Sequence, residues 1–489
     1  MVTPARRATL LVVAAMAVGM GIRIANMVWW RPLEVPPIRS TDFRPEHRNA
    51  LVLGGDAFSY HYQANALAAG HGYADGYRYA NLGDVTPSAA HPPGFSTYLA
   101  AFSLVGLDSP AEHRFASSLL SLVTIAGVAG AARRLVGGAA GERAGNQAAV
   151  IGAWLVALSP AVWINDTMLL SESLAQAAVA VFLYASIRLW KERSWPWAAA
   201  AGVSAAVATL TRNEQIVLFG VLLVMVVARR GERLAHSLRL AAVAGLCGAV
   251  LIVPWVVRNL VTFDHTTILT TGTGAALSAA SCAETYSGPS LGWYYNCFQG
   301  PFPDKVLDPR TGFMIEVDSS GRPIDESGRD IEPMRQAREW ITGHWSEYPK
   351  VVSARVGRLW GWFRPAQTTR FEIALESRGG WQSWAALAGL YLTEIAGVAG
   401  LVVMRRRGLP ISPVLALIGV ATFGAAITFG VGRYRSTAEI ALLLASAIAL
   451  STGWSAGRSL LTARRRSRDQ TASTPIPPST TQTTSAATR

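Results

Sequence analysis

The chain has 489 residues, of which 51% are hydrophobic and only 15% are charged. This balance is too apolar for an ordinary soluble protein, and several uninterrupted apolar runs reach the roughly 20 residues that a helix needs to cross a bilayer. The formal net charge of +13 is compatible with nucleic-acid binding, but most arginines stand at the ends of apolar runs, where the positive-inside rule places them. The sequence therefore predicts an all-α polytopic membrane protein, because helices satisfy their own backbone hydrogen bonds inside lipid.

The N-terminal residues 1–30 are expected to form the first transmembrane helix. Arg6 and Arg7 precede its apolar run, which lacks a small-residue cleavage pattern, so the helix should stay uncleaved with its N-terminus in the cytoplasm. Residues 31–112 mix prolines, tyrosines and charges with shorter apolar stretches. They are expected to form a first external loop with interfacial helices.

Residues 93–107 are apolar but marginal in length for a transmembrane helix. If they crossed the membrane, the next helix would place Arg133 and Arg134 outside, against the positive-inside rule. We therefore interpret this stretch as a re-entrant or interfacial helix. Every strongly basic turn then lies inside, and the chain has about ten transmembrane helices. Those after the first are expected at about 114–132, 147–164, 173–190, 195–210, 215–229, 237–257, 383–404, 412–430 and 437–456.

The predicted layout beyond the first loop has four parts. They are transmembrane helices 2–7 (113–257), an external α/loop domain (258–380), transmembrane helices 8–10 (381–456) and a disordered cytoplasmic tail rich in Thr, Ser and Pro (457–489). The external domain ends in a Trp-rich stretch, 334–363, whose spacing suits a helix at the lipid headgroups. Cys282 and Cys297 share this domain and could form a disulfide if it faces an oxidising compartment.

Short polar motifs stand at the expected outer ends of the helices. The first loop contains Gly54-Gly55-Asp56, then a Tyr/Ala/Leu segment, a Gly-x-Gly-Tyr turn and His91-Pro-Pro. Four more follow in order: Leu170-Ser-Glu172, Leu210-Thr-Arg-Asn-Glu214, Pro254-Trp-Val-Val-Arg-Asn259 and Gly432-Arg-Tyr-Arg435. Together they resemble the polyprenyl-phosphate-dependent glycosyltransferases of the GT-C fold, nearest to the protein O-mannosyltransferase and aminoarabinose-transferase-like groups. The resemblance reaches to about residue 450 but leaves out 264–330.

The resemblance implies transfer of a sugar from a polyprenyl-phosphate donor to an acceptor hydroxyl of a glycan, lipid or protein, on the outer face of the cell membrane. Such a reaction needs a carboxylate for the acceptor and cations for the leaving phosphate. Asp56 is the expected base, although its position is also compatible with a cap of the helix that starts at Ala57. Glu172 is the second expected acidic residue, with Asp166 as its rival, although a glutamate in a first helical turn also favours the helix dipole.

Five arginines fall at the outer ends of the helices, on the side where the positive-inside rule does not expect them. A polyprenyl phosphate would supply the anion that they require. Each one alone is also consistent with a lipid-headgroup contact, but the set favours a phosphate site, and Arg212 and Arg433 are its strongest members. Tyr60, Tyr62 and His91 are expected to line the substrate cavity. The five are Arg114, Arg212, Arg258, Arg433 and Arg435.

The sequence also indicates which cofactors and alternatives to consider. No His/Asp/Glu cluster has metal-ligand spacing, so no obligatory metal is expected, although Asp56 with Glu172 could hold a divalent cation. A Gly-rich nucleotide loop is also missing, which favours a lipid-linked donor. The resemblance implies a hexosyl- or pentosyltransferase with a mannose or arabinose donor, and no residue selects between them. The alternative is a transporter or flippase of lipid-linked or anionic substrates, but such proteins usually show internal repeats, and none is found.

Overall fold

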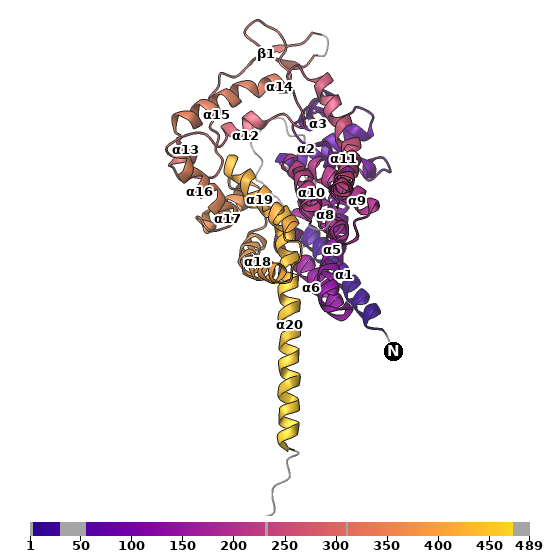
Figure 1. Cartoon of the computed structure of the whole chain (residues 1–489). Helices are drawn as coiled ribbons and strands as arrows, with labels where there is room; N and C mark the ends of the chain where they lie inside the picture. The colour runs from indigo at the N-terminus through magenta and orange to yellow at the C-terminus, as the bar shows by residue number, and fades with distance from the viewer. Residues whose placement is uncertain (1–2, 30–54, 230–232, 310–311, 377, 473–489) are drawn as a thin grey trace, which may run out of the picture.

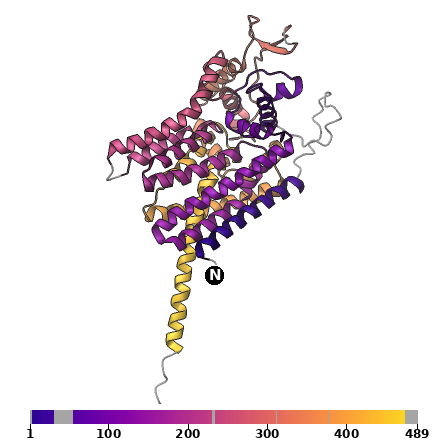
Figure 2. The same cartoon turned by 90° about the vertical axis from the view of Figure 1, so that its right-hand side faces the viewer.

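The computed structural model describes residues 3–29, 55–229, 233–309, 312–376 and 378–472, with side chains up to Trp454. The structure is a bundle of long helices that carries a smaller helical domain and one two-stranded hairpin at one end (Figure 1). This arrangement confirms the all-α polytopic fold class. The N-terminus lies at the opposite end of the bundle from the hairpin (Figures 1 and 2).

Six helical segments in the described part of the chain are long and apolar enough to cross a membrane. They are α1 (Pro4–Trp29), α5 (Pro110–Ala140), α8 (Glu172–Glu192), α11 (Leu234–Thr262), α18 (Gly380–Arg406) and Gly432–Trp454, which joins the 3-10 turn η3 (Gly432–Arg435) to the start of α20 (Ser436–Ala472). Shorter helices lie among them: α9 (Trp195–Thr209), α10 (Val217–Val227) after the 3-10 turn η2 (Asn213–Ile216), and α19 (Ser412–Ile427). The total of ten spans stays a prediction.

One expected span, 147–164, is not a single straight helix. It divides into α6 (Glu142–Leu158) and α7 (Pro160–Thr167), which meet at an angle of 53°. Pro160 opens α7 because proline has no amide hydrogen and its ring excludes a continuing helix on its N-terminal side. The bent pair would form a seventh span if it crosses the membrane as one unit.

The last helix is longer than expected. The backbone of α20 stays helical to Ala472, so the part of the predicted disordered tail from 457 to 472 is helical instead. The residues in this stretch include Leu, Ala and several Arg, which are good helix formers, and these outweighed the polar composition on which the prediction rested. Residues 473–489 lie outside the described residues.

Small residues allow the helices of the bundle to approach closely. A Cβ atom at Gly202 of α9 would collide with the backbone of Ala244 in α11, and one at Gly400 of α18 with that of Ala445 in α20. Close backbone contact of this kind is typical of helices that associate in a membrane, where packing rather than water exclusion holds them together.

The external face carries short elements from two regions of the chain. The first loop forms α2 (Gly55–Ala68), α3 (Gly76–Leu82) and α4 (Pro93–Ser103). With 11 residues, α4 is only about 17 Å long and too short to cross a bilayer. The external domain contains α12 (Thr273–Ser278), α13 (Ala283–Tyr286), the antiparallel strands β1 (Asp304–Leu307) and β2 (Met314–Val317), α14 (Glu326–Arg329), α15 (Ile331–Gly343), α16 (Tyr348–Leu359) and α17 (Pro365–Leu375).

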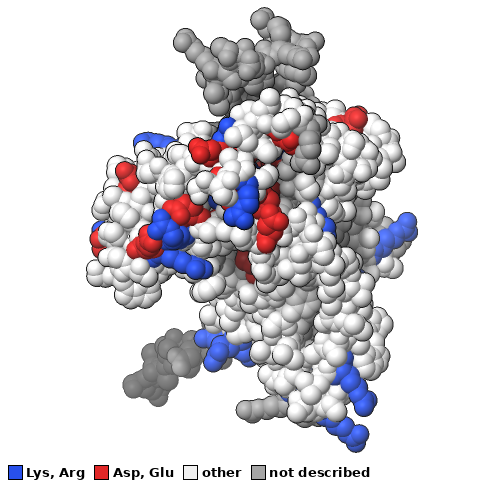
Figure 3. Space-filling model, turned by 90° about the horizontal axis from the view of Figure 1, so that it is seen from above, with Lys and Arg blue, Asp and Glu red and all other residues white. Residues whose placement is uncertain are grey.

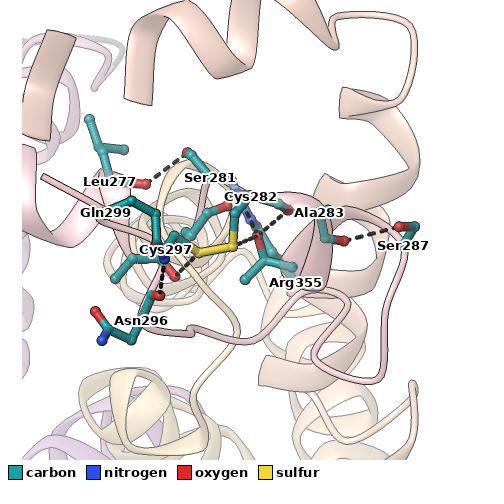
Figure 4. The surroundings of a disulfide bond; sticks show 12 residues. Leu277, Ser281, Cys282, Ala283, Ser287, Asn296, Cys297, Gln299 and Arg355 are labelled. Carbon is teal, nitrogen blue, oxygen red and sulfur yellow. Dashed lines mark hydrogen bonds between the residues drawn. A yellow bond between two sulfur atoms is a disulfide. The ribbon is translucent and has the colours of Figure 1, made fainter. Parts of the chain in front are cut away.

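The Trp-rich stretch of the external domain is not one helix. It divides into α15 and α16, and Trp345 lies in the break between them. Trp345 and Trp362 are exposed, whereas Trp360 is buried. Seen from above, acidic and basic side chains lie beside one another on the external domain (Figure 3). Its two cysteines, Cys282 and Cys297, form a disulfide bond (Figure 4).

Candidate functional site

Asp56 lies in the first turn of α2, and its carboxylate faces a guanidinium group from the far end of the sequence. Arg433 Nη2 donates to Asp56 Oδ2 at 2.7 Å, across 377 residues of chain. His91 Nε2 lies 3.8 Å from the other carboxylate oxygen. Gly55 precedes Asp56 with φ +56°, a left-handed conformation that glycine adopts without strain. The aspartate side chain is 34% exposed, so solvent or a substrate can reach it.

Arg433 is the centre of the site because it faces three carboxylates. Besides Asp56, its Nε lies 3.4 Å from Glu376 Oε1 and 3.8 Å from Glu172 Oε1. The turn η3 that carries Arg433 begins at Gly432, whose backbone amide donates to Glu372 Oε1 at 2.7 Å. A side chain at Gly432 would collide with that carboxylate. The glycine of the Gly-Arg-Tyr-Arg motif therefore leaves room for this carboxylate beside the backbone.

A second arginine, Arg212, joins the network through Glu172. Its Nη1 donates to Glu172 Oε1 at 2.8 Å, and its Nε donates to Glu214 Oε1 at 2.6 Å. The guanidinium of Arg212 also lies 4.8 Å from the ring centre of Tyr434, which places a polarisable surface beneath the cation. Glu172 is almost fully buried at the start of α8. Its burial is tolerated because arginines pair with it.

The rival acidic residue, Asp166, belongs to a different contact. It pairs with Arg23 of α1, with Arg23 Nη2 2.6 Å from Asp166 Oδ2, and both side chains are fully buried in the bundle. This ion pair ties α1 to α7. Glu172, rather than Asp166, therefore lies with Asp56 in the site.

Two residues of the site have no counterpart in the sequence motifs. Glu376 follows α17, and its Oε2 accepts a hydrogen bond from Arg378 Nε at 3.1 Å. Arg378 in turn donates from Nη2 to Asn165 Oδ1 at 3.1 Å, which links the pair to α7. The criterion that selected Arg212, a charged residue at the outer end of an apolar run, also applies to Arg378, which stands two residues before α18.

The surroundings shift the pKa values of two carboxyls in opposite directions. Burial alone would raise the pKa of Asp56, but the positive charges of Arg433, His91 and Arg212 lower it to about 2. Burial raises the pKa of Glu376, and the charges of Arg433 and Arg378 do not offset it. Asp56 and Glu376 both face Arg433, yet their pKa values are shifted in opposite directions. Carboxyls with such different pKa values are typical of sites that divide acid and base roles.

The other predicted residues divide into those near the network and those elsewhere. Tyr60 is buried and its ring lies 4.6 Å from that of His91, so both stand beside Asp56. Tyr62 packs on Phe58 instead, with their ring centres 4.5 Å apart. Of the five predicted arginines, Arg114, Arg258 and Arg435 do not contact Asp56, Glu172 or Glu376 within the described residues. The expected role of all five in phosphate binding stays a prediction.

Each of those three arginines has its own surroundings. Arg258 donates to the backbone oxygens of Tyr73 and Ser88 in the first loop. Arg435 donates from Nε to Glu439 at 2.6 Å and lines a small polar cavity beside Arg433. Arg114 is buried in α5, and its Nε and Nη1 have no hydrogen-bond partner within the described residues.

The carboxylates surround a guanidinium group and not a vacant centre. Among the described residues, no group of three or more His, Cys, Asp or Glu side chains is arranged to hold a metal ion. Arg433 lies between Asp56, Glu172 and Glu376 and supplies the positive charge that balances them. The fold and this site together define a polytopic helical membrane protein with a carboxylate and guanidinium network at the start of several helices.

Comparisons with known proteins give a family match over about a third of the chain. Residues 90–257 match the family described as dolichyl-phosphate-mannose-protein mannosyltransferase. This match confirms, over those residues, the resemblance that the motifs indicate. It includes His91, Glu172 and Arg212, whereas Asp56 and Arg433 lie outside it. No curated protein sequence is significantly similar to the chain.

Two solved structures are among those to which the chain is similar. The oligosaccharyltransferase AglB of Archaeoglobus fulgidus, in complex with an inhibitory peptide and a dolichol-phosphate, is 15% identical with a TM-score of 0.49, over 93% of this chain and 52% of that one. ArnT of Cupriavidus metallidurans, bound to undecaprenyl phosphate, is 18% identical with a TM-score of 0.33, over 81% of this chain and 74% of that one. The chain thus spans about half the length of the oligosaccharyltransferase.

Proposed function

We propose that this protein is a membrane glycosyltransferase that moves a sugar from a polyprenyl-phosphate donor to an acceptor hydroxyl. The observation that carries the proposal is the direct contact between Asp56 and Arg433, 2.7 Å apart, with Arg212 joined to them through Glu172. Transfer to a hydroxyl needs a proton acceptor and a cation close together, because the proton leaves the acceptor while charge builds on the phosphate.

The reaction follows from this arrangement. The acceptor oxygen attacks the anomeric carbon, its proton passes to the carboxylate of Asp56, and the bond between that carbon and the phosphate oxygen breaks. The electron pair of the broken bond leaves with the polyprenyl phosphate, whose charge rises from about −1 to −2 near neutral pH. Arg433 and Arg212 stabilise the added charge. A single displacement of this kind inverts the anomeric centre.

Asp56 must gain basicity during the cycle. The contact with Arg433 holds the pKa of Asp56 at about 2, and so weak a base removes a hydroxyl proton poorly. A donor phosphate that takes over part of the Arg433 guanidinium would release Asp56 from this contact. The base then becomes stronger only when the donor is bound.

The family match and the charge pattern refine the proposal. The description of the matched family favours a mannose donor, and hence a hexosyl transfer, among the open possibilities. Arg6, Arg134 and Arg405 stand at the helix ends far from the external domain, which by the positive-inside rule favours a site on the outer face of the cell membrane. Protein, glycan and lipid all remain possible acceptors.

The Asp56→Asn variant tests the proposal. The purified variant should be inserted and folded like the wild type but should lose transfer from a polyprenyl-phosphate donor. Asp108→Asn is the matched control, because Asp108 is an exposed carboxylate of the same external loop. Labelled sugar in the acceptor is the readout, and it separates bond breaking from the counterflow that a transporter would show. Full transfer by Asp56→Asn would refute the mechanism.

A further inference from the structure

A disulfide bond closes a loop of the external domain that we call the disulfide loop, residues 282–297 (Figure 4). The covalent link between Cys282 and Cys297 limits the conformations that the loop can adopt. The backbone adds a further link near the same end, since Tyr295 N donates to Ala279 O at 2.8 Å. The beginning and the end of the loop are therefore held together.

Two buried arginines of α16 fix the loop and the residues just before it to the rest of the protein. Arg355 Nη2 donates to Ala280 O at 2.8 Å, and Figure 4 shows its side chain beside the disulfide. Arg358 donates from Nε to Leu291 O at 2.6 Å and from Nη2 to Pro289 O at 3.3 Å. Neither arginine pairs with a carboxylate within the described residues. Since a buried guanidinium group needs hydrogen-bond acceptors, these carbonyl contacts constrain both side chain and loop.

The last part of the loop rests against the segment that leads to Arg433. Gly430 N donates to Gly292 O at 2.9 Å. A Cβ atom at either glycine would collide with the backbone of α16, at Ala354 for Gly292 and at Arg355 for Gly430. Gly292 also has φ +76°, which other residues rarely adopt. Disulfide loop, α16 and the approach to η3 therefore pack as one unit.

Tyr294 directly follows this anchored stretch and leads toward the site. Its ring centre lies 5.2 Å from that of Phe429, and Phe429 lies 5.4 Å from Tyr434, the ring between the two site arginines. Tyr294 is only half-buried, so one part of its ring is open to the solvent. Burial, with the nearby charge of Glu376, raises the pKa of Tyr294 to about 12, so the phenol stays neutral.

We propose that Tyr294 contacts the sugar that is transferred, and that the disulfide loop holds its ring as one wall of the sugar site. The inference rests on the proposed function and adds a substrate-contacting residue to it. A sugar ring presents C–H groups on one face, and a rigid aromatic ring covers such a face at a small cost in side-chain entropy. The neighbouring Tyr295 is exposed and lies outside the aromatic series, so it offers a matched comparison within the same loop.

The first experiment measures donor kinetics for Tyr294→Ala, Tyr294→Phe and Tyr295→Ala with the purified full-length protein and mannosyl polyprenyl phosphate as the probe. Tyr294→Ala should raise the donor KM about tenfold with little change in kcat, which is the size expected for a lost aromatic contact. Tyr294→Phe keeps the ring and should stay within about twofold of the wild type. Tyr295→Ala should match the wild type.

The second experiment asks whether the disulfide acts through Tyr294. The Cys282→Ala/Cys297→Ala variant should also raise the donor KM, and adding Tyr294→Ala to it should give less than the product of the separate effects, because the ring is already displaced. A disulfide that serves stability alone would lower the melting temperature and leave KM unchanged, and that result would overturn the link between loop and ring.

Different results would refute the sugar contact and the proposed function. If the wild type transfers sugar and Tyr294→Ala keeps the wild-type donor KM, the sugar contact is refuted while the glycosyltransferase reading stands. If Tyr294→Phe loses as much as Tyr294→Ala, the ring is not the contact and the proposal also fails. Absence of any transfer by the wild type, with every donor tested, would instead refute the proposed function.

Discussion

Replacing Arg433 by glutamine removes the one positive charge that three carboxylates share. Arg433 lies 2.7 Å from Asp56, 3.4 Å from Glu376 and 3.8 Å from Glu172. Glutamine keeps much of the side-chain volume and two N–H donors but carries no charge. The variant should therefore lose both the cohesion of the site and most of the stabilisation of the leaving phosphate.

The expected loss of stability and the expected loss of activity in Arg433→Gln can each be given a size. Removing one partner of a buried ion pair costs about 3–5 kcal/mol, and the cost here should fall below that range because Asp56 is 34% exposed and Arg433 itself is 19% exposed. For catalysis, removing one preorganised group that stabilises developing negative charge lowers the rate by about a hundred- to a thousandfold. The loss of activity should therefore be larger than the loss of stability alone can explain.

The assay compares initial rates of transfer with thermal unfolding of the purified proteins. Arg322→Gln is the matched control, because Arg322 is 81% exposed and pairs only with residues of its own turn, and it should change neither quantity. Arg433→Lys should recover less than half of the lost rate, since lysine cannot reach several carboxylates as a planar group. Transfer by Arg433→Gln within about threefold of the wild type would refute the role of this cation in the reaction.

Four further results are expected. In Arg433→Gln, the largest of the charges that oppose burial is lost, so the pKa of Asp56 rises from about 2 and the acidic limb of the pH–rate profile moves to higher pH. Arg23→Met should lower stability by about 3–5 kcal/mol in a thermal unfolding assay, whereas adding Asp166→Leu should recover most of it. Chelators should leave the transfer rate unchanged, because Arg433 already lies between the carboxylates. In Glu376→Gln, the donor KM should become nearly independent of pH.

Much of the site could be predicted because it follows from topology. Asp56, Glu172, Arg212 and Arg433 each stand at one end of an apolar run, and the basic turns fix which end lies inside. Residues at the same end of neighbouring transmembrane helices lie at a similar depth in the membrane. Once the topology was assigned, the proximity of these four side chains was therefore expected, although their pairing was not.

The remaining parts depend on contacts that no local pattern indicates. Glu376 joins the site because α16 and α17 fold back over η3, and Tyr294 because the disulfide loop packs on α16. Such long-range contacts leave no periodicity in the sequence. The bend at Pro160 was missed for a different reason, since the apolar run continues through it and a proline in the first turn of a helix keeps the composition unchanged.

The charges of the network explain why Glu376 should govern how the donor binds. Three guanidinium groups (Arg212, Arg378 and Arg433) contact four carboxylates (Asp56, Glu172, Glu214 and Glu376), so the guanidinium groups alone leave one carboxylate charge unbalanced when all are ionised. A phosphodiester donor brings another negative charge and would be repelled. Burial raises the pKa of Glu376, whereas that of Asp56 is lowered, so Glu376 takes up a proton more readily than Asp56.

Proton uptake by Glu376 would therefore accompany donor binding. Because its pKa is raised, the protonated form is present at low pH and is lost as the pH rises through the folded-state value, so the donor KM should increase with pH. Before the donor binds, Asp56 has a pKa of about 2 and is ionised, so the proton that accompanies donor binding goes to Glu376. Glutamine at position 376 mimics the protonated form. A donor KM that depends on pH equally in Glu376→Gln and in the wild type would show that the proton goes elsewhere.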